Sequence, residues 1–164
     1  MTPGDLRIGH GYDLHRLQPG GTLRLGGVVV DATQSAVAHS DGDVVFHALV
    51  DAILGALGRG DIGEHFPNTD PRWEGSDSSI FLQGAMDEAR LVRMRVVNVD
   101  VTVLCERPKL NAFKPQMVAN IAALTEAVSV NIKAGTNEGC DAVGRGEAIA
   151  AHALVLLAAE AETP

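Results

Sequence analysis

Three side chains in the first 47 residues could together bind a transition metal. Asp13 and His15 lie two positions apart, and residues so spaced on a β-strand point to the same side of the sheet. His47, in a segment with helical spacing, could complete the set. Two imidazoles and one carboxylate with an open fourth position are typical of catalytic zinc. The chain has six histidines, so a chance pair of surface residues is the competing interpretation.

A second polar group surrounds the start of the first expected helix. Ser40 and Asp43 form a capping-box-like pattern, which accounts for part of this segment. Capping does not explain His39, or the i,i+4 spacing of His47 and Asp51. That spacing would let Asp51 orient His47, or couple to its charge, as a partner behind the metal. A solvated carboxylate on an exposed helix face explains Asp51 equally well.

Two glycine-rich loops could bind a polar or phosphorylated ligand. Residues 59–76 form a long loop, and loops of this length in small domains are usually functional. Asp61 and the exposed amides of this loop could hold hydroxyls of a polyol. Residues 133–139 follow an expected strand, and their amides could cradle phosphate, with Glu138 holding a hard cation such as Mg²⁺. Ordinary surface turns explain both loops as well.

The spacing of apolar residues predicts the elements that position these side chains. Recurrence at helical spacing favours helices, and strict alternation favours strands. We expect helices over residues 40–58, 77–93 and 108–127, the last interrupted or delayed by Pro115, and strands over 6–14, 97–103 and 128–133, with two short strands within 22–30. Interspersed strands and helices indicate an α/β or α+β fold.

Composition excludes several classes of protein. The 164 residues, 46% of them hydrophobic, fit one domain spanning 1–164, without the apolar run of roughly 20 residues that crosses a membrane. A net charge of −8 and 4% aromatic residues argue against a nucleic-acid partner. Cys105 and Cys140 fit no zinc-ribbon spacing and are expected to be reduced. Residues 1–10 contain no hydrophobic signal core, so we expect a cytoplasmic protein.

The order of the motifs resembles that of one enzyme family. In one register the chain carries IGHGYDLH at 8–15, AHSDGDVVFHALVDAILGALGRGDIG at 38–63, FPNTDP at 66–71, NVDVT at 98–102, RPKL at 107–110 and GRGEAIA at 144–150. Over residues 6–158 the chain is similar to the 2-C-methyl-D-erythritol 2,4-cyclodiphosphate synthase family of the non-mevalonate isoprenoid pathway. The first two blocks together are far more specific than either block alone.

The resemblance implies a fold and an assembly. The expected unit is a compact single domain with a mixed four-stranded sheet, a small hairpin and helices on one face. It would form a homotrimer with active sites between subunits. The alanine-rich segment 147–159 favours a helix by propensity. We nevertheless expect a strand there, because alternate residues from Ile149 to Val155 can form one face of a strand.

The resemblance also implies a reaction, that of a phosphorus–oxygen lyase. The substrate, 4-diphosphocytidyl-2-C-methyl-D-erythritol 2-phosphate, would cyclise by attack of its 2-phosphate on its own β-phosphate, releasing CMP. The nucleophile is tethered, so the enzyme needs mainly to align it and to neutralise charge. The implied residues are Asp13, His15 and His47 as zinc ligands, Glu138 as a ligand of Mg²⁺ or Mn²⁺, and His39 and Thr136 as catalytic groups that fix the reacting phosphates.

The substrate contacts implied by the resemblance fall in three segments. Those near the methylerythritol are Ser40, Asp61, Ile62, Gly63, Phe66, Pro67, Asn68, Thr69 and Asp70. Those near the cytosine, on a neighbouring subunit, are Cys105, Glu106, Arg107, Pro108, Lys109, Leu110 and Asn111. Those near the phosphates or the trimer axis are Gly135, Asn137, Ala142 and Arg145.

Three of these positions depart from the family pattern. Asn68 replaces an aspartate, Gly135 reduces a threonine-rich stretch, and Ala142 lies where an aromatic borders a cavity for isoprenoid diphosphates on the trimer axis. These changes leave two alternatives. One is a zinc-dependent hydrolase of nucleoside diphosphate esters on the same scaffold, and the other is a non-catalytic trimeric protein that binds metal or nucleotide.

Overall fold

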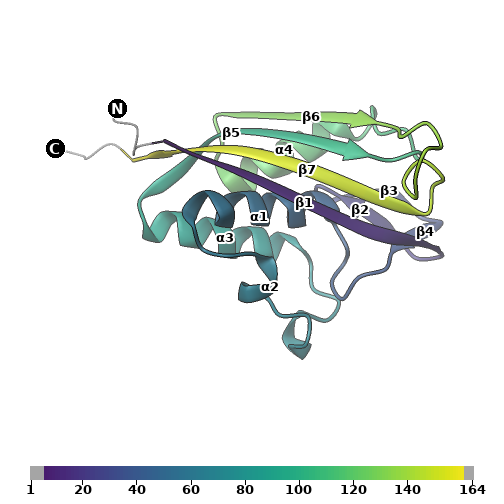
Figure 1. Cartoon of the computed structure of the whole chain (residues 1–164), viewed down its shortest axis with the longest axis horizontal. Coiled ribbons are helices and arrows are strands. Elements are labelled where there is room, and N and C mark those ends of the chain that lie inside the picture. Colours follow the sequence, from purple (N-terminus) through teal and green to yellow (C-terminus); the bar gives the residue numbers. More distant parts are fainter. Residues whose placement is uncertain (1–5, 161–164) are drawn as a thin grey trace.

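A mixed five-stranded sheet organises the chain, and the computed structural model describes residues 6–160 (Figure 1). The strand order is β4–β1–β7–β5–β6, in which only β5 and β6 run parallel. The strands are β1 (Leu6–Pro19), β4 (Gln34–Ala36), β5 (Met94–Leu104), β6 (Ser129–Gly135) and β7 (Ala148–Ala159). A separate hairpin pairs β2 (Leu23–Leu25) with β3 (Val28–Asp31), as expected from the sequence.

The sheet has one strand more than expected, so the prediction of four strands was wrong. The additional strand is β4, which pairs with residues 17–19 of β1. β1 itself runs five residues past the expected end at Leu14, to Pro19. That extension leaves unpaired backbone groups at the edge of the sheet, and β4 covers them. Three residues of sequence QSA carry no alternation that could have announced a strand.

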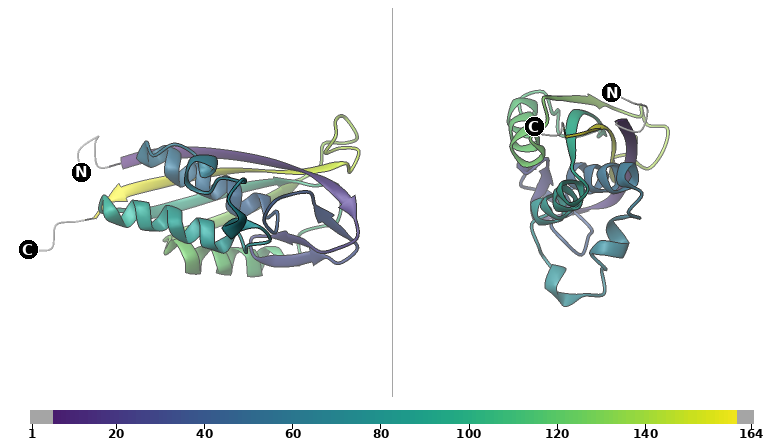
Figure 2. Two further views of the ribbon diagram at one scale, coloured as in Figure 1. Left: turned by 90° about the horizontal axis from the view of Figure 1, so that it is seen from below. Right: turned by 90° about the vertical axis from the view of Figure 1, so that its left-hand side faces the viewer.

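The helices cover one face of the sheet (Figure 2). They are α1 (Val44–Leu57), α3 (Ser79–Leu91) and α4 (Lys114–Thr125), and all three fall within the expected ranges. α4 begins late because Pro115 occupies its first turn, where a missing N–H costs nothing. The long loop contains two short helices, α2 (Ile62–His65) and η2 (Pro71–Trp73). Within residues 6–160, no helix is both long and apolar enough to cross a bilayer.

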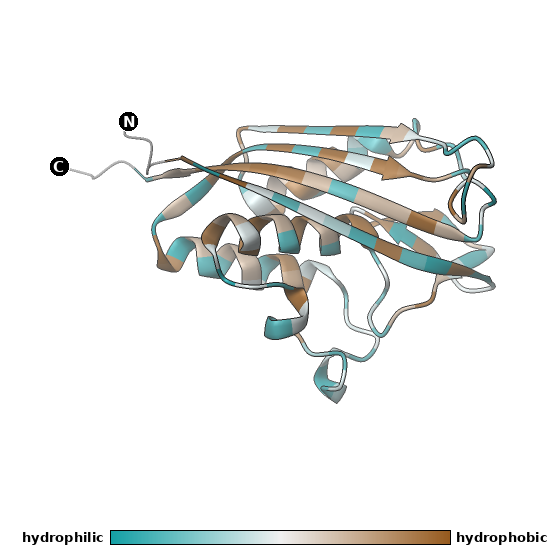
Figure 3. Cartoon of the chain, in the orientation of Figure 1, coloured by the Kyte–Doolittle hydropathy of each residue, from teal (hydrophilic) through white to brown (hydrophobic). Residues whose placement is uncertain are grey.

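The alanine-rich tail forms β7, which confirms the strand. β7 lies between β1 and β5 and pairs with both of them, so its backbone is hydrogen-bonded on two sides. Hydrophobic residues extend along nearly all of it (Figure 3), as is typical of a strand buried in the centre of a sheet. Helix propensity is a weak preference, and these tertiary contacts override it.

Two glycines of β1 allow the strand to touch the backbone of α1. A Cβ atom at Gly9 would lie 1.7 Å from the carbonyl oxygen of Ala52, and one at Gly11 would lie 1.9 Å from that of Ala48. Odd-numbered residues of β1 therefore face the helix, whereas its even-numbered residues point away from it. The close approach brings His47, on α1, beside the two residues of β1 that follow the glycines on this face.

Asp43 alone caps α1 and also fixes the hairpin. Its Oδ1 accepts hydrogen bonds from the amides of Val45 and Phe46 at 3.0 and 3.2 Å, and from Gly26 at 2.9 Å. Its Oδ2 accepts from the Gly27 amide at 2.7 Å. Burial raises the pKa of this carboxyl, although the hydrogen bonds from the amides act in the opposite direction. The expected capping box of Ser40 with Asp43 was therefore wrong, because the Ser40 hydroxyl lies against His47 instead.

Replacing Asp43 with asparagine should lower the free energy of unfolding by about 3 kcal/mol, because a buried N–H would face the Gly27 N–H. Thermal and denaturant unfolding of the variant measure this loss. Asp87→Asn, on the exposed face of α3 where the side chain is 70% exposed, is the matched control and should change stability by less than about 0.5 kcal/mol. Equal losses in the two variants would contradict a structural role for the Asp43 carboxylate.

Candidate metal centre and substrate cavities

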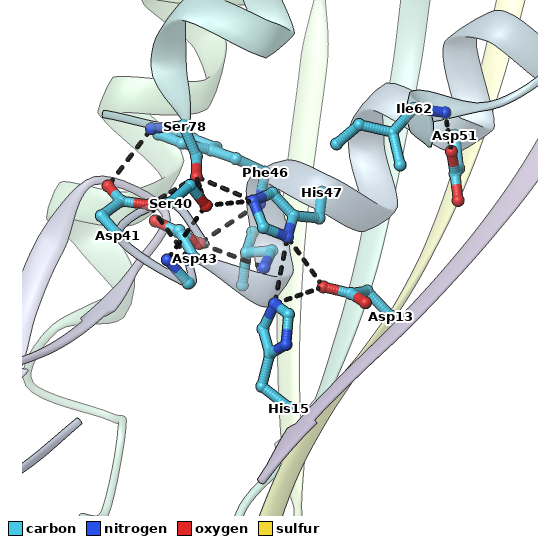
Figure 4. Close-up of polar contacts among 12 residues, drawn as sticks. Asp13, His15, Ser40, Asp41, Asp43, Phe46, His47, Asp51, Ile62 and Ser78 are labelled. Carbon is cyan, nitrogen blue, oxygen red and sulfur yellow. Dashed lines mark hydrogen bonds and ion pairs between the residues drawn. The ribbon is translucent and has the colours of Figure 1, made fainter. Parts of the chain in front are cut away.

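Asp13, His15 and His47 converge as the sequence predicts (Figure 4). Asp13 Oδ2 lies 3.0 Å from both His15 Nε2 and His47 Nδ1, and these two nitrogens are 3.1 Å apart. A tetrahedral zinc ion with ordinary bond lengths separates its ligand atoms by about 3.3 Å. The three atoms therefore fit a zinc-sized cation with only a small outward movement.

The environment of the triad suits a charged ligand with one open side. Burial works against ionisation of Asp13, but its contacts with the imidazoles of His15 and His47 outweigh this and hold its pKa well below the usual range. The side chains of the three residues are 11–24% exposed. The site is thus mostly buried, and it opens toward a cavity that His47 also lines.

The side chains that hydrogen-bond to His47 do not include Asp51, which spacing suggested. The Asp51 carboxylate accepts a hydrogen bond from the Ile62 amide at 2.8 Å, at the start of α2, and burial raises its pKa. His47 Nε2 instead lies 2.8 Å from Ser78 Oγ and 3.1 Å from Ser40 Oγ (Figure 4). Ser78 carried no signal in the sequence, because a serine ahead of a helix is explained by capping alone.

A cavity of about 340 Å³ adjoins the triad through His47. Its lining includes eight of the expected site residues, namely His39, Ser40, His47, Ile62, Gly63, Phe66, Pro67 and Asn68. Ala38, Trp73 and Phe81 complete it and were not expected. Phe66 packs against the rings of Trp73 and Phe81 at centroid distances of 5.4 and 4.9 Å, which makes one wall aromatic.

Three expected contacts of the same loop lie outside this lining. Asp61 caps α2 by accepting from the Glu64 amide at 3.1 Å. Asp70 forms an ion pair with Arg72 at 2.6 Å, which lowers the pKa of Asp70. Thr69 is exposed. Two of the three thus have local structural roles in the structure as it stands.

A second, smaller cavity of about 130 Å³ lies where β5 and β6 end. It is lined by Cys105, Pro108, Lys109, Leu110, Asn111, Ala134, Gly135 and Thr136, seven of them among the expected residues. Burial raises the pKa of Cys105 to about 11, so its thiol stays neutral. Thr136 Oγ1 donates to Glu138 Oε1 at 2.8 Å beside this cavity.

The remaining expected residues lie around the loop after β6. Glu106, Arg107 and Arg145 line a polar cavity of about 600 Å³. The Asn137 amide donates to Glu106 Oε1 at 2.9 Å. Ala142 packs on a small apolar cluster centred on Val143.

The two groups of site residues lie on different strands of the same sheet. Asp13 of β1 pairs with Ala151 of β7, which pairs with Val103 of β5, which in turn pairs with Ala134 of β6. Three inter-strand spacings amount to about 14 Å. One chain therefore presents the metal triad and the cavity at Thr136 as two separate groups of residues.

An α+β fold in which three side chains are placed to hold a metal ion defines the class of this protein, and comparison identifies its family. The chain belongs to the YgbB family, which it matches over residues 6–158. It is 49% identical over 154 residues to the 2-C-methyl-D-erythritol 2,4-cyclodiphosphate synthase of Bordetella pertussis, covering 93% of this chain and 95% of that protein.

Solved structures share the fold as well as the sequence. The bifunctional IspDF of Campylobacter jejuni superposes with a TM-score of 0.91 at 39% identity, covering 94% of this chain and 42% of that one. IspF of Plasmodium falciparum, in its CDP complex, gives 0.84 at 33% identity and covers 98% and 100%. The resemblance of the motifs to this family is confirmed.

Proposed function

We propose that this chain converts 4-diphosphocytidyl-2-C-methyl-D-erythritol 2-phosphate to the 2,4-cyclodiphosphate and CMP, in isoprenoid biosynthesis. The observation that carries the proposal is the convergence of Asp13, His15 and His47 beside a cavity lined by His39. The relatives named for this reaction cover nearly the whole chain, and one related structure is a CDP complex.

The chain's own residues bind and align the substrate in this proposal. Asp13, His15 and His47 hold zinc, which would supply a Lewis acid for a phosphate oxygen. His39 faces the cavity beside them and orients the 2-phosphate. Glu138 is the carboxylate for Mg²⁺ or Mn²⁺, and the Thr136 hydroxyl beside it fixes the other phosphates. A chain of net charge −8 needs such cations to bind a polyanion.

The remaining substrate contacts divide between two proposed half-sites, namely the metal triad with its adjoining cavity and the cavity at Thr136. The cavity at His39 takes the methylerythritol, with Asp61, Thr69 and Asp70 turning toward it when substrate is bound. The cavity bounded by Cys105 and Asn111 takes the cytosine, recognised by its backbone hydrogen-bonding groups. The reacting phosphates would lie between the methylerythritol and the cytosine, and we place these two groups on neighbouring subunits.

The proposed assembly is a homotrimer that joins half-sites of neighbouring chains. The face of the sheet away from the helices exposes Ile8 (74%), Tyr12 (46%), Leu14 (43%) and Leu154 (46%). An apolar patch of this kind marks an interaction surface. Light scattering should give about three times the mass of the 17.2 kDa chain. We place the enzyme in the cytoplasm, where its unpaired cysteines would persist as thiols.

Glu138→Gln should weaken the response of the rate to Mg²⁺, with an apparent affinity for Mg²⁺ lower by about tenfold or more, because a neutral amide is a poorer ligand for a hard cation. Titrating the initial rate with Mg²⁺ measures this, and zinc content should stay at the wild-type level. Glu126→Gln, on the exposed end of α4, is the control. An unchanged titration for Glu138→Gln would remove the residue from its proposed role.

The experiment that tests the function is ³¹P NMR of the products formed with Mg²⁺ present. Two coupled signals of a cyclic diphosphate, together with CMP, establish intramolecular transfer. CMP with an acyclic bisphosphate would instead establish the hydrolase. Bound zinc with no turnover would favour the binding protein.

A further inference from the structure

The Ser78 hydroxyl is fully buried but does not cap the helix that it precedes. Ser78 is the N-cap residue of α3, a position where a serine side chain usually accepts from an amide of its own helix. Here it makes no such bond. Its oxygen instead lies between His47 Nε2 and the Asp41 carboxylate (Figure 4).

Chemistry fixes the direction of each hydrogen bond in this row. A carboxylate only accepts, so the Ser78 hydroxyl proton goes to Asp41 Oδ1. The Ser78 amide donates to the other carboxylate oxygen at 3.2 Å, which holds Asp41 in place. With its single proton used, Ser78 Oγ accepts from His47, and Nε2 of His47 must carry the proton, at 2.8 Å.

The second hydroxyl near His47 is compatible with the same assignment. Ser40 Oγ lies 3.1 Å from His47 Nε2 and accepts from the Gly42 amide at 3.3 Å. It is also 3.4 Å from Ser78 Oγ, to which it can donate its proton. Both serine oxygens can therefore accept from the His47 N–H.

The consequence appears on the other side of the ring. A neutral imidazole protonated at Nε2 has a lone pair at Nδ1, and this atom lies 3.0 Å from Asp13 Oδ2. His15 Nε2 lies 3.0 Å from Asp13 Oδ2 and 3.1 Å from His47 Nδ1, so a proton on His15 can lie between these two acceptors in the metal-free protein. A cation can take the place of that proton, because the His47 lone pair and the carboxylate are then both available as ligands.

We propose that Ser78 and Asp41 are positioning residues that hold His47 in the tautomer which offers Nδ1 to a metal. The inference rests on the zinc site of the proposed function and deepens it. The row Asp41–Ser78–His47 links the loop before α1, the start of α3 and α1 itself, so it also fixes the rotation of the ring. Groups behind a ligating histidine set its orientation and basicity, and losing one typically weakens metal binding 10–100-fold.

The first test measures zinc affinity by chelator competition, with zinc alone as the probe and no substrate. Ser78→Ala and Asp41→Asn should each bind zinc about 10–100-fold more weakly than wild type. Ser79→Ala removes a hydroxyl from the adjacent residue, which pairs with Asp77, and should bind zinc normally. Thermal unfolding verifies that each variant is folded. If Ser78→Ala is too unstable to measure, Asp41→Asn, which preserves side-chain volume, provides the test.

The second test reads the tautomer directly from ¹⁵N NMR of the His47 ring in the metal-free protein. Wild type should show a proton on Nε2, and Ser78→Ala should show a mixture of tautomers. A folded Ser78→Ala with wild-type affinity and an unchanged tautomer would overturn the proposal. If the variants weaken zinc binding but the wild-type protein shows no synthase turnover, the proposed function is refuted and the positioning role stands.

Discussion

Gly11→Ala should lower the free energy of unfolding by about 3 kcal/mol and weaken zinc binding at the same time. The new methyl group would lie 1.9 Å from the Ala48 carbonyl oxygen and 2.7 Å from the Ala52 amide nitrogen. Both atoms are backbone, so no side chain can rotate away, and overpacking of this kind commonly costs 1–3 kcal/mol or more. Strand β1 and helix α1 must separate, which moves His47 away from its two partners on β1.

Gly55→Ala provides the matched control on α1, near the end of the helix. Gly55 is exposed, and nothing lies within 4 Å of a Cβ added there. The same substitution should therefore stabilise the protein by about 0.5–1 kcal/mol, because alanine favours a helix interior more than glycine does. Denaturant unfolding and zinc titration of both variants check this. Equal stability in the two variants would show that the strand–helix contact tolerates a methyl group.

Local patterns predicted the regular elements well because each depends on neighbours in the sequence. The alternation over residues 97–103 marks β5, and the helical spacing of apolar residues after Ser40 marks α1. β4 was missed because three residues are too few to show a period. It forms only because the extended end of β1 supplies a partner.

The metal triad was predictable for a different reason from the groups that support it. Asp13 and His15 share a face by strand geometry alone, and the motif context pointed to His47. The hydrogen bond between His47 and Ser78 joins positions 31 apart, so no spacing rule reaches it. The i,i+4 spacing did suggest Asp51, but its carboxylate is taken by the Ile62 amide. Such choices depend on which donors the fold brings close.

The structure also explains why strand β1 needs glycine on one face and large side chains on the other. On β1, Gly9 and Gly11 lie against α1, whereas Ile8 and Tyr12, which flank this pair of glycines, point outward. A single strand thereby serves two purposes. Its inner face sets the distance to His47, and its outer face supplies the apolar surface for the proposed trimer.

His15→Ala should reduce synthase activity about 10³-fold and leave little zinc bound after dialysis. Removing one of three protein ligands leaves Asp13 and His47 as a two-atom site, which loses the charge stabilisation of several kcal/mol that a bound metal gives to phosphoryl transfer. The side chain of His15 makes its polar contacts with Asp13 and His47 and is not part of the hydrophobic core, so its loss should not unfold the protein. Metal analysis per chain and the initial rate at saturating Mg²⁺ measure the two effects.

His10→Ala separates loss of the ligand from any general effect of altering β1. His10 belongs to the same strand but points to the opposite face, where its Nε2 lies 3.1 Å from His152 Nδ1. This variant should retain one zinc ion per chain, since none of its atoms reaches the triad. If His15→Ala kept as much zinc as His10→Ala, the assignment of the triad would be wrong. If instead only His15→Ala lost zinc but both kept full activity, the metal would be bound without a role in the reaction.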